Sequence, residues 1–175
     1  MKHWTSFLVL VFLFASSFAW AEMEMGKVPP GVELKGETGG RLDGASWSSA
    51  ELQGKVHVLF YVDPDEKDLN NDASEALDKE KLPSEKFGSV AVINMAATWL
   101  PNFVIASSLE EKQKRYPRTL YVRDNKKVLV RTWKIADDTS DILAFDKNGK
   151  LLFRKDGKLN AGEIQKLIQA IKENL

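Results

Sequence analysis

Two short acidic stretches contain the side chains of this chain that are best suited to chemistry. The six carboxylates in them are Asp63, Asp65, Glu66, Asp137, Asp138 and Asp141. If the fold brings the two stretches together, the cluster would suit a hard cation such as Ca²⁺, or a basic peptide segment. Alternatively, the first three cap a helix, the last three flank a turn, and water solvates all of them.

The other residue types exclude most kinds of catalytic site. The chain contains no cysteine, which excludes disulfides, dithiol exchange, cysteine peroxidase chemistry and cysteine-based zinc sites. His57 stands within an apolar run, where a hydrogen-bonded core histidine is expected. The chain has no Gly-x-Ser-x-Gly elbow and no glycine-rich phosphate loop. We therefore assign no catalytic residue and expect no bound cofactor.

Alternating strands and helices must position the acidic stretches. Apolar runs, prolines and caps predict strands at 56–62, 89–94, 119–122, 128–130, 142–145 and 151–153, and helices at 63–81, 101–115 and 160–175. The strand–helix–strand order indicates a parallel section of sheet, and the hairpin over 142–153 adds antiparallel strands. We therefore expect an α/β fold, a thioredoxin-like single domain with a mixed central sheet flanked by helices.

That fold would place the two acidic stretches face to face. Redox proteins with a thioredoxin-like fold carry Cys-x-x-Cys between the first central strand and the next helix. They also carry a cis-proline in the facing loop. Here residues 63–66 occupy the first position and Ser140 occupies the second. We expect carboxylates to replace the sulfur site, with Ser140 as a candidate contact for a partner.

A second candidate contact is the segment between the strand at 89–94 and the next helix. It contains Trp99 and Leu100. If exposed, these side chains would suit a protein contact, because aromatic anchors dominate such interfaces. The interpretation we favour is that both cover an edge of the sheet.

The N-terminal segment has the pattern of an export signal. Lys2 and His3 precede an apolar run over 7–14, and Ala19 and Ala21 fit the A-x-A cleavage pattern. The apolar stretch is shorter than the ~20 residues of a spanning helix, although an uncleaved anchor is the alternative. We predict a signal peptide over 1–21, one domain over 22–175, a periplasmic location and no stable membrane span after cleavage.

The charge balance restricts the class of partner. The chain has 25 Lys and Arg residues against 25 Asp and Glu residues. Nucleic-acid-binding proteins usually show a basic surface, which this balance does not favour. We expect another exported protein as the partner and no nucleic acid.

Several short motifs appear in an order that resembles a known family. They are Gly26-Lys27-Val28-Pro29-Pro30, Trp47-Ser48-Ser49-Ala50, Leu52-x-Gly54-Lys55-Val56, Ser107-Ser108-Leu109, Tyr116-Pro117 and Leu143-x-x-Asp146-Lys147-x-Gly149. The chain resembles the YtfJ family, small exported bacterial proteins with a thioredoxin-like fold and no thiol pair. Family members carry a small, less acidic, glycine-containing loop where this chain has residues 63–66.

The resemblance implies no established activity and no catalytic residue. Together with the missing cysteines, it suggests a non-catalytic protein-binding or adaptor module of the periplasm. The alternative is a cation-binding protein, or a metal-dependent hydrolase, that uses the acidic cluster.

Overall fold

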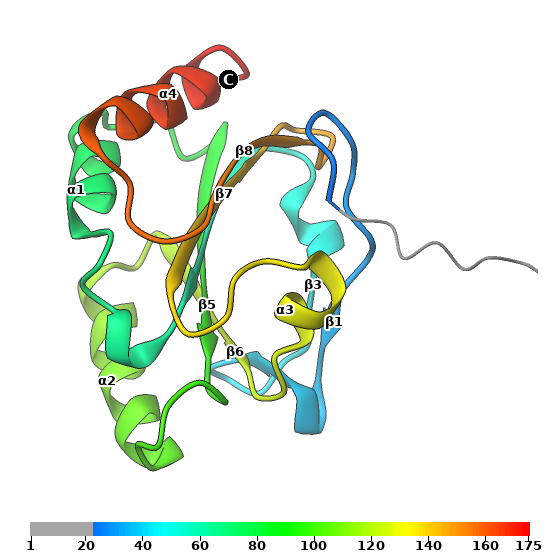
Figure 1. The fold of residues 1–175 in the computed structure, drawn as a ribbon, viewed down its shortest axis with the longest axis vertical. Helices are drawn as coiled ribbons and strands as arrows, with labels where there is room; N and C mark the ends of the chain where they lie inside the picture. Colours follow the sequence, from blue (N-terminus) through cyan, green and yellow to red (C-terminus); the bar gives the residue numbers. More distant parts are fainter. Residues whose placement is uncertain (1–22) are drawn as a thin grey trace, which may run out of the picture.

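The structure of the protein is a computed structural model that describes residues 23–175. Within this range, six strands form one mixed sheet in the order β2-β6-β5-β4-β7-β8 (Figure 1). The strands are β2 (Gly39–Arg41), β4 (Val56–Val62), β5 (Phe87–Asn94), β6 (Thr119–Asp124), β7 (Ser140–Phe145) and β8 (Leu151–Lys155). Strands β4, β5 and β6 run parallel, whereas β2, β7 and β8 pair antiparallel with their neighbours. The predicted mixed central sheet is confirmed.

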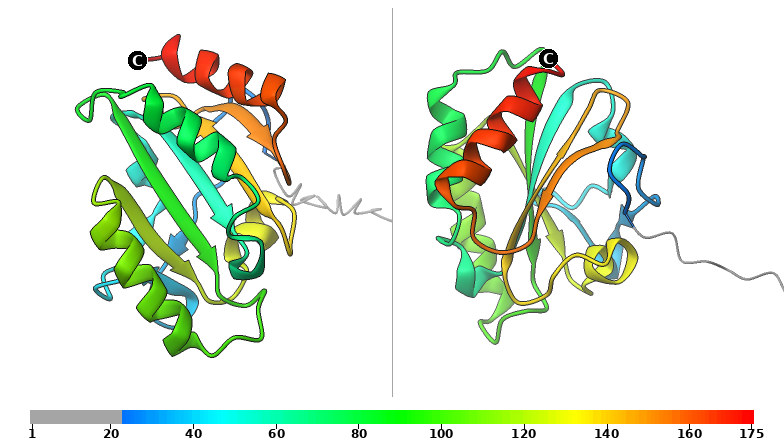
Figure 2. Two further views of the ribbon diagram at one scale, coloured as in Figure 1. Left: turned by 90° about the vertical axis from the view of Figure 1, so that its left-hand side faces the viewer. Right: turned by 45° about the horizontal axis from the view of Figure 1, so that its top comes forward.

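Helices and short strands cover the two faces of the sheet differently. On one face, the α1–α2 face, lie α1 (Asn71–Lys79), α2 (Asn102–Arg115) and α4 (Ala161–Lys172) (Figures 1 and 2). On the other, the α3 face, lie α3 (Val128–Trp133) and the small sheet of β1 (Glu33–Leu34) and β3 (Trp47–Ser48). Because side chains alternate along a strand, the apolar run of β4 supplies both faces.

The α3 face has a continuous apolar core. Leu59 and Tyr61 of β4 pack there with Val90 and Val92 of β5 and with Trp133 at the end of α3. The ring centroids of Trp133 and Phe145 lie 6.0 Å apart with the planes tilted by 51°, a favourable aromatic arrangement. The indole N–H of Trp133 also donates to the carbonyl of Pro30 at 2.8 Å. This hydrogen bond ties the segment before β1 to α3.

Capping side chains mark the starts of two helical segments. Ser48 and Glu51 form a capping box at the 3₁₀ turn η2 (Ser49–Leu52). In α4, the Asn160 side chain accepts from the backbone N–H of Glu163 at 2.9 Å, and Glu163 accepts from Asn160 at 2.9 Å. The buried residues of α4 are Ile164, Leu167, Ile168 and Ile171.

The helix predicted over 63–81 is wrong in its first half. Asp63 caps only a 3₁₀ turn, η3 (Pro64–Glu66), and the α-helix starts later, at Asn71. The reason is the buried Asn70, whose amide donates to the carbonyls of Ser140 at 2.9 Å and Gly157 at 3.1 Å. Its side-chain oxygen accepts from the N–H of Leu159 at 2.9 Å. These long-range bonds hold the Asn70 backbone outside the helical conformation, with φ −115° and ψ 29°.

The strand predicted over 128–130 is also wrong, because these residues form α3. The carboxylate of Asp124 accepts from the backbone N–H groups of Val128 at 2.9 Å and Leu129 at 3.0 Å. A helix leaves such N–H groups without partners in its first turn, and a carboxylate stabilises them. The apolar triplet therefore reflects the buried side of a short helix.

The remaining expectations have simple outcomes. The predicted helix over 101–115 and the hairpin over 142–153 are confirmed. The predicted signal peptide lies outside the described residues. No helix within residues 23–175 combines the length and the apolar character that crossing a bilayer requires.

Candidate functional site

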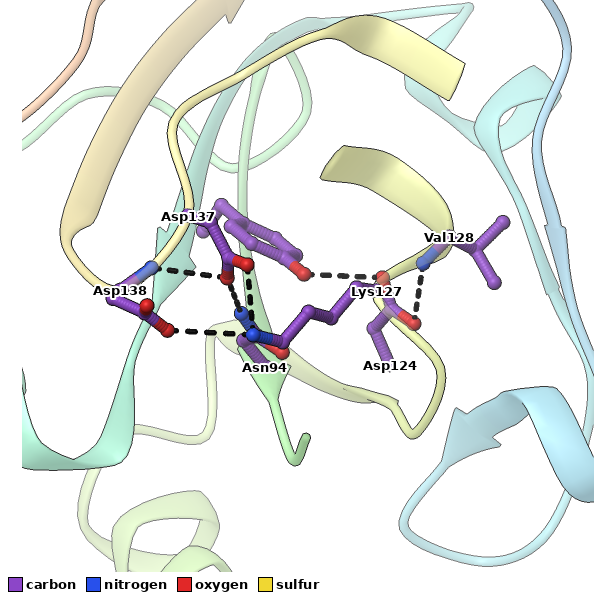
Figure 3. Close-up of polar contacts among 7 residues, drawn as sticks. Asn94, Asp124, Lys127, Val128, Asp137 and Asp138 are labelled. Carbon is purple, nitrogen blue, oxygen red and sulfur yellow. Dashed lines mark hydrogen bonds and ion pairs between the residues drawn. The ribbon is translucent and has the colours of Figure 1, made fainter. Parts of the chain in front are cut away.

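Three polar side chains stand where the parallel strands β4, β5 and β6 reach their carboxyl ends. They are Tyr61, Asn94 and Asp124. In open α/β sheets, this edge is where ligands usually bind. Figure 3 shows Asn94 and Asp124 together with Lys127, Asp137 and Asp138 from the two loops that flank α3, and Tyr61 joins them through its hydrogen bond to Asp124. We call this group the strand-end cluster.

Asp124 organises the part of the cluster that faces the core. It is 0% exposed and accepts from the Tyr61 hydroxyl at 3.2 Å, in addition to its bonds to the first turn of α3. The backbone N–H of Lys126 also donates to it at 3.1 Å. Burial and the nearby Asp124 carboxylate raise the pKa of Tyr61, so the phenol keeps its proton and donates. Asp124 is therefore saturated with donors and holds α3 in place.

Lys127 connects the outer part of the cluster. Its ammonium lies 2.7 Å from Asp137 and 3.3 Å from Asp138, as Figure 3 shows. The amide of Asn94 donates to Asp137 at 3.0 Å. Partial burial opposes the charged form of Asp137, but the hydrogen bonds from Lys127 and Asn94 outweigh it and lower the pKa of Asp137. The hydrogen bond to Asp137 raises the pKa of Lys127. Both groups are charged at neutral pH, and they form an ion pair with each other.

The two acidic stretches do meet, as the expected fold requires. The backbone N–H of Asp63 donates to the carbonyl of Thr139 at 3.0 Å. The Asp63 carboxylate accepts from the N–H of Asp65 at 2.8 Å, and its own burial raises its pKa. Asp65 and Glu66 are exposed. The loop after β4 and the loop before β7 are therefore joined through their backbones.

Asp141 belongs to a different environment. It is 0% exposed within β7, and the N–H of Gly157 donates to it at 3.0 Å. Burial, the largest cause, raises its pKa to about 7. Its second carboxylate oxygen has no hydrogen-bond partner in the part of the chain that the structure describes.

The six predicted acids consequently divide among separate roles. Within residues 23–175, no group of three or more acidic or histidine side chains is arranged to hold a metal ion. Asp137 and Asp138 are paired with Lys127, and Asp141 points away from solvent. The geometry gives the cation-binding alternative no ligand set in this range.

His57 lies at the opposite end of β4 from the cluster. Its Nδ1 lies 3.0 Å from the Leu52 carbonyl and 3.1 Å from that of Lys55, and burial lowers its pKa. The expected hydrogen bonds are confirmed, although the ring is only half-buried. The distance along β4 separates this histidine from the strand-end cluster.

The loop after β5 exposes an aromatic side chain beside η3 (Pro64–Glu66), which we call the acidic turn. Trp99 is 86% exposed and Phe103, in the first turn of α2, is 76% exposed. The expectation that Trp99 covers a sheet edge is wrong; Leu100 alone packs inward, against the cluster beneath α2. The Thr98 hydroxyl donates to Asp65 at 3.2 Å and accepts from the N–H of Leu100 at 3.2 Å. Leu100 points inward because of this turn, and Trp99 points outward.

The other candidate contact, Ser140, is only 2% exposed. It begins β7, pairs with Val62 of β4, and presents its carbonyl to Asn70. Its side chain is therefore not part of the surface. The residues of the cluster that sequence reasoning missed are Tyr61, Asn94, Asp124 and Lys127. For Asn94 and Asp124, the signal was a polar residue ending each of two neighbouring parallel strands.

Comparison with protein families gives a match over almost the whole described range. A family model described as "Bacterial protein of unknown function (YtfJ_HI0045)" matches residues 27–174. The Escherichia coli (strain K12) "Uncharacterized protein YtfJ" is 30% identical over 157 residues, covering 85% of each chain. An "Uncharacterized protein" of Haemophilus influenzae is 30% identical over 129 residues, covering 71% of this chain and 70% of the relative.

Solved structures share the fold at low sequence identity. A putative protein disulfide isomerase from Bacteroides thetaiotaomicron is 14% identical with a TM-score of 0.63, covering 87% of this chain and 91% of its own. Arabidopsis thaliana ScoI with copper bound is 14% identical with a TM-score of 0.60, covering 84% and 99%. The exposed lipoprotein thioredoxin of Streptococcus pneumoniae is 16% identical with a TM-score of 0.57, covering 82% and 99%. These similarities confirm the thioredoxin-like fold.

Proposed function

Because this chain belongs to the YtfJ family and combines a thioredoxin-like fold with a complete lack of cysteine, we propose that it is an exported, non-redox protein-binding module. It binds a protein segment beside the edge where redox proteins of this fold carry their thiols. The bound segment has an apolar anchor and basic residues next to it.

The observation that carries this proposal is the pair of exposed aromatic side chains next to the acidic turn. Trp99 and Phe103 present large apolar surfaces to solvent, and aromatic anchors contribute most of the affinity in protein interfaces. The Thr98–Asp65 hydrogen bond connects their loop to the exposed carboxylates of Asp65 and Glu66. This combination favours a partner that is apolar and positively charged.

The state of the polar groups supports binding over catalysis. Asp124 has its acceptors filled by backbone N–H groups and Tyr61, and Lys127 is paired with two carboxylates. Such groups hold a surface in shape and are poorly placed to exchange protons with a substrate. An adaptor needs this kind of rigid support.

The predicted signal over 1–21 supports export to the periplasm. Fractionation of cells that produce the full chain, followed by N-terminal sequencing, tests this part separately. We expect a periplasmic protein that begins at Glu22. A protein that retains residues 1–21 and stays in the cytoplasm would contradict it.

Photocrosslinking in the periplasm tests the binding surface. A benzophenone amino acid at Phe103 should give one reproducible crosslinked partner, and Trp99→Ala should remove most of that product. The same photoreactive residue at Lys166, which is exposed on α4, is the control. Equal products at both positions, or no reproducible product at Phe103, would refute the proposed surface.

A further inference from the structure

The α1–α2 face does not close into one core. One apolar cluster packs under α1 and α4 around Val58 and Ile142. Another packs under α2 around Ile93 and Leu109. The left view of Figure 2 shows α1 and α2 apart from each other, with β5 running between them. A groove runs along this line, lined by α1, α2 and the sheet.

The floor of the groove consists of small side chains on the central strand. Ser89 of β5 lies between Val58 and Thr119 in the register, and Ala91 lies between Phe60 and Tyr121. The neighbouring β5 residues Val90 and Val92 point to the other face, because strand side chains alternate. Over residues 89–92, the strand therefore has large residues toward the α3 face and small ones toward the groove.

Two hollows make up the groove, and they share lining residues. One, of about 410 Å³, has more apolar than polar surface and includes Val58, Leu77, Leu82 and Phe87. Its lining also contains charged residues: Glu75, Asp78, Lys79, Lys81 and Arg118. The other, of about 590 Å³, continues toward α2. Both are lined by Phe60, Ser89, Tyr116 and Thr119. These volumes fall in the range of small-molecule sites, about 300–1,000 Å³.

Cations line the wider hollow. Lys67, Lys112 and Arg115 contribute to it, and within residues 23–175 none of the three lies within ion-pairing distance of a carboxylate. Arg115 stacks on the Tyr116 ring, with its guanidinium carbon 5.4 Å from the ring centroid. The carboxylates that also line this hollow are all exposed: Asp68, Glu75 and Glu111.

Lys112 is the cation with the strongest need for a partner. Burial lowers its pKa below the usual value; Asp68 partly offsets this effect and Lys67 adds to it. A half-buried ammonium without a carboxylate at ion-pairing distance is unfavourable, since burial removes its hydration. An anion bound beside it would restore the lost stabilisation.

We propose that the α1–α2 groove binds a single-chain amphipathic anion, with its apolar chain along Phe60 and Leu82 and its acidic head beside Lys112 and Arg115. The Val58, Leu82 and Phe87 side chains of the first hollow match the apolar chain, and Lys112 and Arg115 of the second hollow match the acidic head. The head is a carboxylate or a phosphate.

A peptide strand is the less suitable occupant. Strands β4, β5 and β6 each have a hydrogen-bonded neighbour on both sides, so the floor offers no free edge for strand addition. A plain hydrocarbon chain needs no main-chain partners. The groove therefore suits a long-chain fatty acid or alkyl phosphate better than a polypeptide.

Fluorescence titration of the purified protein with parinaric acid, a naturally fluorescent fatty acid, tests the proposal. We expect saturable binding, displaced by oleate and by oleyl phosphate, and displaced at least about tenfold less well by oleyl alcohol. A water-soluble short-chain phosphatidylglycerol, kept below its micelle concentration, should not displace the probe, because it carries two chains. Displacement by this lipid would mean that a two-chain lipid is bound, and would overturn the single-chain assignment.

Variants separate the head from the tail. Lys112→Gln should weaken parinaric acid binding at least about tenfold, whereas Lys114→Gln, on an exposed residue of α2 outside the groove lining, should leave it unchanged. Ser89→Leu should abolish binding by filling the floor. The melting temperature of Lys112→Gln should stay the same or rise, because an unpaired half-buried charge is removed. Absence of saturable binding, or equal affinities for oleate and oleyl alcohol with an unchanged Lys112→Gln, would refute the site.

Discussion

The two faces of the same three parallel strands differ in how completely they are covered. The α3 face has one continuous core, in which the strand residues Leu59, Val92 and Val122 pack with Trp133, Val32 and Leu34. On the α1–α2 face, Ser89 and Ala91 lie under a groove between two separate clusters. Side chains therefore fill the α3 face completely, whereas the α1–α2 face keeps a groove.

This difference indicates on which face the protein can bind a ligand without losing stability. A closed core has little free volume, so a change of one methylene is felt there. A groove accepts new atoms at lower cost. The strand-end cluster belongs to the closed side, since Tyr61 and Asp124 connect it to α3.

The largest expected effect comes from opening the closed face. Trp133→Ala should lower the free energy of unfolding by about 3–5 kcal/mol, because it removes a fully buried ring and its hydrogen bond to Pro30. Phe60→Ala, on the groove side, should cost less than half as much, since that ring is only partly buried. Urea unfolding measures both. Equal losses would show that the two faces are equally packed.

The next effect concerns the support of α3. Asp124→Asn should cost about 1–3 kcal/mol, because an amide cannot accept from all of the N–H groups that converge there. Hydrogen exchange should show faster exchange in α3 than in α4. Asp138→Asn, on an exposed side chain, is the matched control and should stay within about 0.5 kcal/mol of the parent.

Adding volume on opposite sides of β5 tests the comparison directly. Val92→Phe should destabilise by about 1–3 kcal/mol, because it overpacks a fully buried position. Ser89→Leu should be neutral or stabilise by up to about 1 kcal/mol, since the added carbons enter a hollow. Thermal unfolding at one pH measures the pair. A destabilised Ser89→Leu together with a tolerant Val92→Phe would reverse our assignment of the faces.

The smallest effect is a dependence on pH from the buried Asp141. Its folded pKa of about 7 lies above that of an unfolded aspartate, so the unfolded chain releases this proton first as pH rises. The contribution of Asp141 to the free energy of unfolding therefore decreases as the pH rises from about 4 to about 7, and it is constant at higher pH. Asp141→Asn should remove this slope and be more stable than the parent at pH 8 by about 1–2 kcal/mol. Urea unfolding at several pH values measures it, and parallel slopes would contradict the assignment.

The sequence predicted those parts of the fold that depend on neighbouring residues. The apolar run of β4 and the capping box at Asn160 require only short-range chemistry, and both are confirmed. The break at Asn70 required knowing that its amide bonds to Ser140 and Gly157, which are far along the chain. The triplet at Val128 was ambiguous because three apolar residues suit a short strand or a short helix.

The candidate site was predictable in place but not in composition. The two acidic loops meet as expected, because the order of strands fixes which loops face each other. The pairing of Lys127 with Asp137 depends on the left-handed backbone of Lys127, with φ 53°, which the sequence did not indicate. The groove could have been anticipated from the alternation of small and large residues over 89–92, which reads as one apolar run when faces are ignored.

The late start of α1 has a consequence for restoring thiol chemistry. A reactive cysteine in this fold gains its low thiol pKa from the first turn of an α-helix, whose dipole stabilises the thiolate. Here residues 63–66 form only a capped 3₁₀ turn, and the α-helix begins at Asn71. Cysteines introduced at the buried Asp63 and the exposed Glu66 would therefore lack that helix end and keep the low reactivity of thiols with an unlowered pKa. The backbone conformation of residues 63–70, as well as the absence of cysteine, therefore disfavours thiol chemistry at this position.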